Sequence, residues 1–400
     1  MTARYDVVVV GAGLVGLATA HHVNRLNPSA KIAVIEAAEH VGQDQSSRNS
    51  GVVHAGVYYP PGSKKATLCV AGRAQLRQFC EKHGLPYVVN GKLIVALNSR
   101  EREALSELER RATANNVPVE RLGPDGLLDY EPHLRGVAAL YSPSTAITDF
   151  GQVAKALAED LRHRHVDIHL STRVTRITQD AHGAHVVTSS GTFMTDRAIA
   201  AVGLQADRLA KRSGLTLTER VVPFRGSWLV LDEALHDIVT HNIYPVPVGN
   251  GLPFLGVHVT RRPDGALWVG PNAVLMASRT GHRRYGMTWR DLADAVTFPG
   301  LWRLAKRHLK TGVGELARDS SIRLMTRELN RYLPDVKPGD LTPGPFGIRA
   351  QLLGRDGTLI DDFRLATDRR VTHVLNAPSP AATASFAIGE ELAHVVTDSA

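Results

Sequence analysis

The 400-residue chain contains only two cysteines, Cys69 and Cys80. So few cysteines exclude a disulfide-stabilised scaffold and a zinc module built on cysteine ligands. The sequence predicts one helix for both, which would separate them by about 16 Å along its axis. A disulfide spans no more than about 7 Å between Cα atoms. We therefore expect two free thiols in a reducing compartment.

Long hydrophobic runs are also missing. The longest apolar stretch, Val7 to Ala20, is interrupted by three glycines. It is shorter than the roughly 18 residues that a membrane-spanning helix needs. It also lacks the basic leader and the small-residue cleavage site of a signal peptide. We therefore expect a cytoplasmic protein that is soluble or, at most, bound at the inner face of the cell membrane.

The charge pattern restricts the partners. Charged residues make up 22% of the chain and hydrophobic residues 43%, which is typical of a folded protein of two or three domains. The net charge of +8 is compatible with anionic ligands, a membrane surface or nucleic acid, but solvated surface charges explain most of it better. No basic cluster, zinc-ligand spacing or RNA-binding aromatic motif is present, so we expect neither nucleic acid nor a metal.

The first 36 residues have the pattern of a strand, a helix and a second strand. Tyr5–Val10 and Lys31–Glu36 are short runs of mostly apolar residues with several β-branched side chains, as in buried parallel strands. Leu14–Asn24 between them reads as a helix that ends before Pro28. The sequence therefore predicts a βαβ unit at the N-terminus.

Three glycines join the first strand to this helix, and each has a physical task. Gly11 permits a tight turn, Gly13 lets the backbone approach a pyrophosphate, and Gly16 lets the helix pack against the strand. The phosphates would face the positive end of the helix. Glu36, at the end of the second strand, is placed to accept the hydroxyls of an adenosine ribose. The pattern predicts dinucleotide binding.

Two further segments favour FAD over NAD. The loop Ser46–Gly51 consists of small and polar residues that can lie along a pyrophosphate and a flavin. Near the C-terminus, Asn376–Thr383 lies between a strand and the last helix. The N–H groups of Ala381, Ala382 and Thr383 would stabilise negative charge on a reduced flavin. An ordinary capped helix is the alternative interpretation of this segment.

The rest of the chain interleaves helices and strands without one repeating register. This pattern predicts an α/β fold in which a Rossmann-type FAD-binding domain carries an inserted α+β substrate domain with a mixed sheet. We predict that the FAD-binding domain is discontinuous and comprises residues 1–85, 145–215 and 341–400, whereas the substrate domain comprises residues 86–144 and 216–340.

Seven ordered segments resemble the D-amino-acid-oxidase-like FAD oxidoreductases and, within them, the family of L-2-hydroxyglutarate oxidases and dehydrogenases. The resemblance implies a substrate-domain sheet that covers the flavin. It also implies oxidation of L-2-hydroxyglutarate, or a closely related 2-hydroxy acid, to 2-oxoglutarate by hydride transfer from C2 to flavin N5. The segments are Asn49–Tyr59, Pro223–Gly226, Asn242–Pro247, Pro253–His258, Gly270–Leu275, Gly347–Gln351 and Asn376–Thr383.

The cofactor-binding residues that we predict combine the glycine motif, the polar loop and the C-terminal segment with two positions at strand ends. They are Gly11, Gly13, Gly16, Glu36, Ser47, Arg48, Asn49, Val174, Gly203, Ala381, Ala382 and Thr383.

The chain departs from the family pattern at two places. Arg48 stands where the family usually has a histidine, and Met276–His282 replaces a stretch that usually contains an aromatic residue, a lysine and a tyrosine. Arg48 would place positive charge beside a reduced flavin or pair with an acidic neighbour. If the second stretch lines the pocket, the substrate would be altered.

Oxidation of a 2-hydroxy acid needs a base for the hydroxyl proton and an anchor for each carboxylate. His54 and His258 are the candidate bases, because imidazole is neutral near pH 7. We prefer His54, which lies in the loop expected to cross the flavin. Packing alone is the alternative explanation for either histidine.

Arg349 lies in a Gly-Ile-Arg sequence that resembles the carboxylate-binding Gly-Leu-Arg of related amino-acid oxidases. A guanidinium binds a carboxylate through two parallel hydrogen bonds. Arg225, Tyr59 and Tyr244 are weaker candidates for the second carboxylate, and a structural salt bridge is the alternative for Arg349.

Two other functions compete with this prediction. An amine or amino-acid oxidase on the same scaffold would need an anionic partner for its ammonium group, and the site segments offer no obvious one. A non-catalytic flavin- or membrane-binding module would not need so many polar residues in its loops. For the enzyme, we expect oxygen or a quinone as the electron acceptor. The basic charge is compatible with a peripheral membrane contact, for which long-range charge alone is weak evidence.

Overall fold

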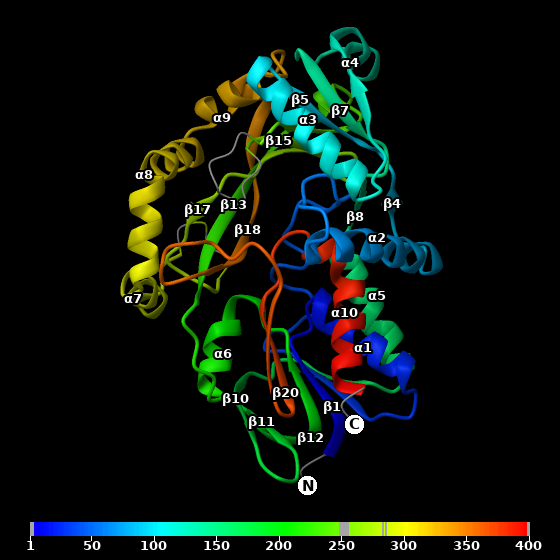
Figure 1. Cartoon of the computed structure of the whole chain (residues 1–400), viewed down its shortest axis with the longest axis vertical. Helices are drawn as coiled ribbons and strands as arrows, with labels where there is room; N and C mark the ends of the chain where they lie inside the picture. The colour runs from blue at the N-terminus through cyan, green and yellow to red at the C-terminus, as the bar shows by residue number, and fades with distance from the viewer. Residues whose placement is uncertain (1–3, 248–255, 282–283, 285, 398–400) are drawn as a thin grey trace.

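The computed structural model describes residues 4–247, 256–281, 284 and 286–397. Their strands form two large sheets and one small sheet. In Figure 1 the first large sheet occupies the lower half of the molecule and the second the upper half. The predicted α/β class with a second, mixed sheet is therefore confirmed.

The first sheet has a parallel centre. β1 (Arg4–Val10) lies between β2 (Ile32–Ile35) and β12 (Gly191–Ala200), and both pair with it in parallel. β9 (Asp167–His169) continues the parallel order beyond β2, and β20 (Val371–Asn376) continues it beyond β12. The strand order is therefore that of a doubly wound sheet, in which ligands bind beyond the carboxyl ends of the strands.

Antiparallel strands extend this sheet. β10 (Val174–Gln179) and β11 (Ala184–Thr188) form a hairpin that pairs with β12. β19 (Arg364–Asp368) pairs with β20.

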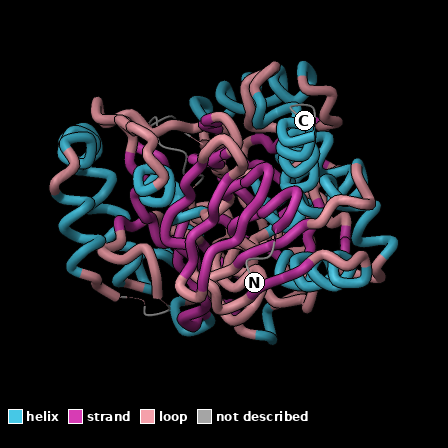
Figure 2. Tube along the Cα trace, turned by 90° about the horizontal axis from the view of Figure 1, so that it is seen from below, coloured by secondary structure: helices cyan, strands magenta, loops and turns pink. Residues whose placement is uncertain are grey.

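Helices cover both faces of the first sheet (Figure 2). Val7 and Val9 of β1 belong to one core, whereas Val8 and Val10 belong to the core on the opposite face. This alternation explains why the whole strand is apolar. The first core contains residues of α1 (Leu14–Leu26), α2 (Lys64–Lys82), α5 (Phe150–His163) and α10 (Ala381–Thr397), and the second contains Leu209 of α6 (Ala206–Arg212).

The helix α10 packs very closely on two neighbours. A Cβ atom on Gly72 of α2 would lie 2.6 Å from the Cα of Ala384, and a Cβ atom on Gly389 would lie 2.6 Å from the carbonyl carbon of Ala18 in α1. Only glycine fits at these two crossings. The last helix is therefore held against the glycine-motif helix α1.

The second sheet is built around the long pair β13 (Arg220–Leu231) and β18 (Leu341–Leu353), which run antiparallel. Its main path is β17-β13-β16-β15-β14-β5-β7-β6. The remaining strands are β5 (Lys92–Ala96), β6 (Glu120–Leu122), β7 (Ala138–Ser142), β14 (Asn242–Pro245), β15 (His258–Arg261), β16 (Leu267–Gly270) and β17 (Val274–Leu275).

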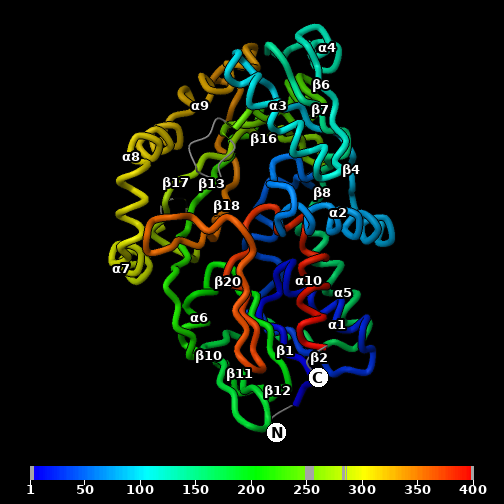
Figure 3. Tube along the Cα trace, in the orientation of Figure 1, coloured from blue at the N-terminus to red at the C-terminus, as the bar shows by residue number. Residues whose placement is uncertain are grey.

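Helices surround the second sheet, and a small sheet lies between the two large ones (Figures 1 and 3). α7, α8 and α9 form one outer edge of the molecule, and α3 and α4 lie beside β5 to β7. The helices are α3 (Ser99–Ala114), α4 (Pro124–Tyr130), α7 (Trp289–Val296), α8 (Pro299–Ser320) and α9 (Ile322–Leu329). The small sheet contains β3 (Val52–Val53), β8 (Ala146–Thr148) and β4 (Tyr87–Val88).

The prediction of two free thiols on one helix is confirmed. Cys69 and Cys80 both lie in α2 and are free and buried. Ser63 caps this helix by accepting a hydrogen bond from the amide of Ala66, and Gly84 follows its end with φ +63°. Among the helices of the described ranges, none has the length and apolarity to cross a membrane.

The division into domains stays a prediction. The predicted FAD-binding segment 341–400 includes β18, but this strand pairs with β13 in the second sheet. The strand therefore connects the two halves of the molecule rather than belonging to the first sheet.

Candidate active site

The glycine motif has the backbone geometry that a dinucleotide site requires. Gly11 has φ +104°, and a Cβ atom there would lie 2.4 Å from the carbonyl oxygen of Ala201. A Cβ atom on Gly16 would lie 1.9 Å from the carbonyl oxygen of Gly11. The turn and the first turn of α1 therefore admit no side chain, and the helix begins directly beyond the end of β1.

Glu36 organises the same turn. One carboxylate oxygen accepts the amide of Ala12 at 2.8 Å, and the other accepts the amide of Ala38 at 2.9 Å. Each oxygen keeps a further lone pair for a ribose hydroxyl. The first turn of α1 contains no acidic residue, so nothing there repels a pyrophosphate. These residues fit a dinucleotide of the FAD type.

The polar loop after β2 is held by its own hydrogen bonds. The side-chain amide of Asn49 donates to the carbonyl oxygens of Gln45 (3.2 Å) and Ser46 (2.8 Å) and accepts the amide of Gly51 (2.9 Å). The hydroxyl of Ser46 accepts the amide of Leu14 at the start of α1 (2.9 Å). The loop is therefore fixed against the end of α1 where phosphates would lie.

Arg48 and Ser47 have mainly backbone partners. The Nε of Arg48 and the hydroxyl of Ser47 both donate to the carbonyl oxygen of Gln43, each at 3.3 Å. Arg48 forms no salt bridge within the described ranges, so the predicted pairing with an acidic neighbour is not observed. A Cβ atom on Gly347 of β18 would lie 2.0 Å from the carbonyl oxygen of Arg48. The second sheet thus passes directly over the loop.

The other predicted cofactor residues lie around this loop. Gly203 has φ +49°, and a Cβ atom there would lie 2.4 Å from the side-chain oxygen of Gln45. Val174 is the first residue of β10 and packs on the core of the first sheet. Their contacts with FAD stay predictions.

The segment at the start of α10 contacts the loop that contains His54. The hydroxyl of Thr383 accepts the amide of His54 at 3.1 Å. The amide of Ala381 donates to the carbonyl oxygen of Pro378 at 2.9 Å, which removes it from the expected flavin donors. Ala382 and Thr383 keep the positions at the N-terminus of α10 that the sequence predicted.

Three polar side chains share one face of the second sheet. Leu93 in β5, Ile243 in β14 and Val259 in β15 all belong to the core on the other face. Because side chains alternate along a strand, their neighbours Lys92, Tyr244 and His258 project to the opposite face, which meets the loop containing His54. The rings of His258 and Tyr244 stack with centroids 3.9 Å apart.

Lys92 is the site residue that the sequence analysis missed. Its side chain is 1% exposed, and no salt bridge with a described residue neutralises it. Its Nζ lies 4.5 Å from the centroid of the Tyr58 ring and 4.9 Å from that of the Tyr244 ring. Burial lowers the pKa of Lys92 to about 7. The available signal was a lysine at the start of the buried run KLIVA.

Both candidate bases are neutral. Burial, followed by the charge of Lys92 and the neighbouring His258, lowers the pKa of His54 to about 3. Burial also lowers the pKa of His258 to about 3, with Arg349 contributing. The Nδ1 of His258 lies 3.0 Å from the carbonyl oxygen of Gly256, to which it donates in the neutral ring. The Nδ1 of His54 is buried and has no hydrogen-bond partner among the described residues.

Arg349 adds a second cation to this cluster. It lies in β18 opposite Phe224, and its guanidinium is close enough to Tyr244 and His258 to influence their pKa values. One of its nitrogen atoms donates to the carbonyl oxygen of Asn272 at 3.4 Å. Lys92 and Arg349 thus supply positive charge to a buried site that holds two neutral imidazoles.

Two of the weaker candidates have other surroundings. Arg225 pairs with Asp319, and both side chains are almost completely buried. A guanidinium neutralised by a resident carboxylate has little charge left for a substrate, so we leave Arg225 out of the site that we propose. Tyr59 packs against Ala66 and Cys69, whereas the hydroxyl of its neighbour Tyr58 is buried without a partner in the described structure.

The stretch that departs from the family pattern, Met276–His282, forms salt bridges with neighbouring helices in its described part. Arg279 forms salt bridges with Asp207 of α6 and with Asp294 of α7. These contacts tie α7 to the first half of the molecule. His282, and residues 253–255 of another family segment, lie outside the described residues.

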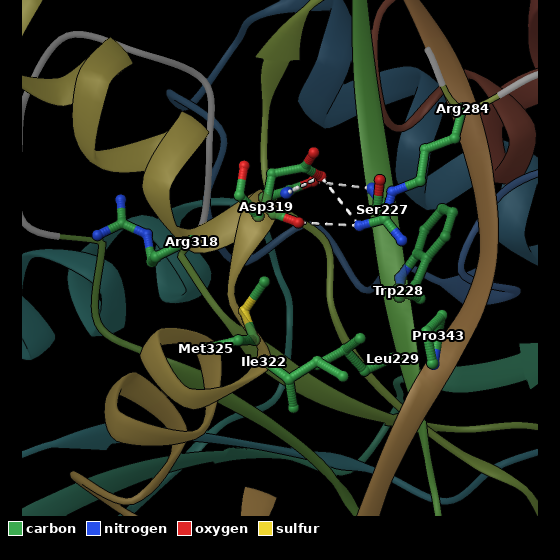
Figure 4. Close-up of a pocket in the computed structure, with 11 residues that line it drawn as sticks. Ser227, Trp228, Leu229, Arg284, Arg318, Asp319, Ile322, Met325 and Pro343 are labelled. Atoms are coloured by element: carbon green, nitrogen blue, oxygen red, sulfur yellow. Dashed lines mark hydrogen bonds and ion pairs between the residues drawn. The ribbon is translucent and has the colours of Figure 1, made fainter.

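Figure 4 shows a cavity that lies away from these residues. It has a volume of about 190 Å³, and its lining includes Ser227, Trp228, Arg284 and Asp319. None of the candidate catalytic residues His54, His258 and Arg349 lines it. It is therefore not the site in which we place the reaction.

Comparison with known families agrees with this geometry. Residues 6–395 match a family described as DAO, FAD dependent oxidoreductase. The chain belongs to this family. FAD is accordingly the cofactor of this oxidoreductase, as the sequence predicted.

Individual relatives indicate the group within this family to which the chain is similar. The oxidoreductase is 42% identical to the mitochondrial L-2-hydroxyglutarate dehydrogenase of Nematostella vectensis, with 98% of this chain and 90% of the relative covered. It is 38% identical to the L-2-hydroxyglutarate dehydrogenase of Escherichia coli strain K12, with 98% and 92% covered. The resemblance to this group is confirmed.

Solved structures confirm the fold. The FAD-bound L-alpha-glycerophosphate oxidase of Mycoplasma pneumoniae superimposes with a TM-score of 0.80 at 23% identity, covering 98% of this chain and 94% of that one. At this identity the likeness concerns the fold of the oxidoreductase alone.

Proposed function

We propose that this oxidoreductase converts L-2-hydroxyglutarate to 2-oxoglutarate. The relatives named for this activity support the substrate. The observation that carries the proposal is the group formed by buried Lys92, buried Tyr244 and half-buried Arg349 beside two neutral histidines. Two cations suit a substrate with two carboxylates.

Arg349 binds one carboxylate and Lys92 the other. Arg349 presents a planar fork that matches a carboxylate, and Lys92 is a compact charge between two aromatic rings. Because burial disfavours the charge on Lys92, a dianion that enters the site restores its protonated form. The hydroxyls of Tyr244 and Tyr58 are donors for the same ligand, since burial raises both of their pKa values.

His54 takes the hydroxyl proton while C2 gives up its hydride. Its backbone is fixed on both sides, because Thr383 accepts its amide and the thiol of Cys69 donates to its carbonyl oxygen at 3.3 Å. His258 holds Tyr244 by stacking. Gly11, Gly16 and Glu36 would hold FAD, which would supply the two-electron acceptor for this hydride.

An amine or amino-acid oxidase is the second candidate function. Its substrate would bring an ammonium group next to Lys92 and Arg349, which repel it. The charges that act on the pKa of His54 come from Lys92, His258 and Lys65, and none of them is acidic. The electrostatics of the cluster therefore favour a hydroxy acid.

The test is anaerobic reduction of the flavin. The purified holoenzyme is mixed with L-2-hydroxyglutarate, D-2-hydroxyglutarate, lactate or glutamate, and the flavin absorbance is followed. We expect fast bleaching with L-2-hydroxyglutarate alone. Faster bleaching with glutamate would contradict this proposal and support an amino-acid oxidase.

The oxidative half-reaction uses oxygen or a quinone in this proposal. Hydrogen peroxide formed in equal amount to 2-oxoglutarate identifies oxygen, whereas reduction of an added quinone without peroxide identifies a quinone. We propose a cytoplasmic protein with a peripheral contact at the inner face of the cell membrane, for which the net charge of +8 is the support.

A further inference from the structure

The helix α8 exposes a row of large apolar side chains. Trp302, Leu309, Val313 and Leu316 are 61%, 64%, 58% and 53% exposed. The last three follow one another at intervals of four and three residues, which places them on one face of a helix. Trp302 lies on the turn before the kink at His308. We call these four residues the apolar stripe.

Trp302 is held in its exposed position. Its indole N–H donates to the carbonyl oxygen of Val296 at the end of α7, at 2.7 Å. The ring is thus oriented by a hydrogen bond while most of its surface faces solvent. The neighbouring α7 adds Trp289, which is exposed as well. An exposed aromatic residue that is fixed in this way is typical of a contact surface rather than of a poorly packed core.

Positive charge accompanies the stripe. Residues 299–313 contain Arg303, Lys306, Arg307 and Lys310 and no acidic residue. Lys306 and Lys310 are exposed, and neither forms a salt bridge with another residue of the described ranges. Lys306 lies four residues after Trp302, before the kink, and Lys310 lies three residues before Val313, after it, so each borders the stripe on its own part of the helix. The nearest acidic residue in α8, Glu315, pairs with Arg318.

We propose that α8 lies on an anionic lipid surface, with the apolar stripe in the headgroup region and Lys306 and Lys310 against lipid phosphates. A helix with tryptophan and leucine on one face and lysines beside them has the composition of a helix that lies in a membrane interface. Figures 1 and 3 show α8 on the outer edge of the molecule, away from α1 and α10. This surface gives the peripheral contact a definite place, and it does not depend on the identity of the substrate.

A second copy of the chain is a less suitable occupant. In a symmetric pair the same surface meets itself, so the lysines of both copies would come together. Like charges at close range oppose such a contact. Anionic lipid neutralises them instead.

Vesicle binding tests the proposal. The holoenzyme is sedimented with vesicles of phosphatidylcholine alone and with vesicles that also contain phosphatidylglycerol. We expect binding to the anionic vesicles at low salt. The double variant Lys306→Glu/Lys310→Glu should lose affinity by about tenfold or more. Leu309→Ser/Val313→Ser should lose a comparable amount at unchanged net charge.

Two controls test whether net charge or exposed apolar residues elsewhere on the protein account for the vesicle binding. Lys82→Glu/Lys155→Glu makes the same charge change on exposed lysines of α2 and α5, and Leu128→Ser removes an exposed leucine of α4. Both should bind the vesicles as the parent does. Quenching of the exposed tryptophans by brominated lipid should fall in Trp302→Phe.

Three results would overturn the proposal. They are absence of vesicle binding, equal loss in the lysine control, and a dimer in sedimentation that Leu309→Ser dissociates. Flavin reduction by the substrate should be unaffected by the α8 variants, so a failed substrate assay and a failed vesicle assay remain distinguishable.

Discussion

The ammonium group of Lys92 lies 4.9 Å from the centroid of the Tyr244 ring, inside the protein, and no carboxylate of the described residues neutralises it. Aromatic faces compensate only part of the cost of burying a charge, which explains why the pKa of Lys92 falls to about 7. The site is therefore short of negative charge until a ligand supplies it.

Ligand binding should take up a proton. At pH 8 Lys92 is mostly neutral, and a bound dicarboxylate raises its pKa, so a proton is taken up. At pH 6 the amine of Lys92 is already charged, so ligand binding should take up no proton there. Calorimetry of 2-oxoglutarate binding to the holoenzyme, in two buffers of different ionisation enthalpy, measures the number of protons taken up per bound ligand. Lys92→Met should abolish the uptake at pH 8. An unchanged uptake in that variant would place the titrating group elsewhere.

Loss of the Arg349 side chain should weaken catalysis strongly. In Arg349→Ala the bound carboxylate loses its fork, which costs about 2–5 kcal/mol of transition-state binding. We expect kcat/KM for L-2-hydroxyglutarate to fall by about 30- to 5000-fold, measured by steady-state kinetics. Arg364→Ala changes an exposed arginine in β19 whose salt bridge with Glu219 is long, at 3.8 Å; it is the matched control and should change little. An Arg349 variant with unaltered kcat/KM removes the residue from the site.

The two histidines should differ in their effect on flavin reduction. His54→Asn removes the base, so the reduction rate should fall by about 10²- to 10⁴-fold. His258→Asn loses stacking on Tyr244 but keeps His54, and a fall of about tenfold is expected. Stopped-flow absorbance with the substrate measures both rates. The reverse order would assign proton removal to His258.

Glu36 should control the affinity for FAD. A carboxylate that accepts ribose hydroxyls contributes about 1.5–3 kcal/mol per charged hydrogen bond. Glu36→Ala should therefore raise the dissociation constant of FAD by about tenfold or more, measured by titration of the apoprotein. Glu39→Ala changes an exposed carboxylate three residues further on and should retain the parental affinity.

Gly16→Ala should destabilise the protein and its complex with FAD. The added Cβ atom would lie 1.9 Å from the carbonyl oxygen of Gly11, so the helix α1 must move outward. Overpacking of this kind costs about 1–3 kcal/mol, visible as a lower Tm. Gly339→Ala meets no atom within 4 Å and should melt as the parent does. Equal melting of both variants would contradict the close approach of α1 to the turn.

The local features could be predicted from the sequence because their causes are local. The turn at Gly11, the helix that begins at Leu14 and the strand that ends at Asn376 depend on neighbours within a few residues, and the structure has all three. Lys92 could not be recognised, because its environment comes from Tyr58 and Tyr244, which are far away in the sequence. Arg225 was a candidate for substrate binding for the same reason: its partner Asp319 lies 94 positions away, so the sequence does not show that its charge is neutralised.

The hydrogen bond between His54 and Thr383 joins positions that are 329 residues apart. A nascent chain on the ribosome therefore carries an incomplete reaction centre until α10 has emerged. Cofactor loading should be a late event of biosynthesis, and a protein shortened by its final helix should be recovered without yellow colour even if its glycine turn is intact.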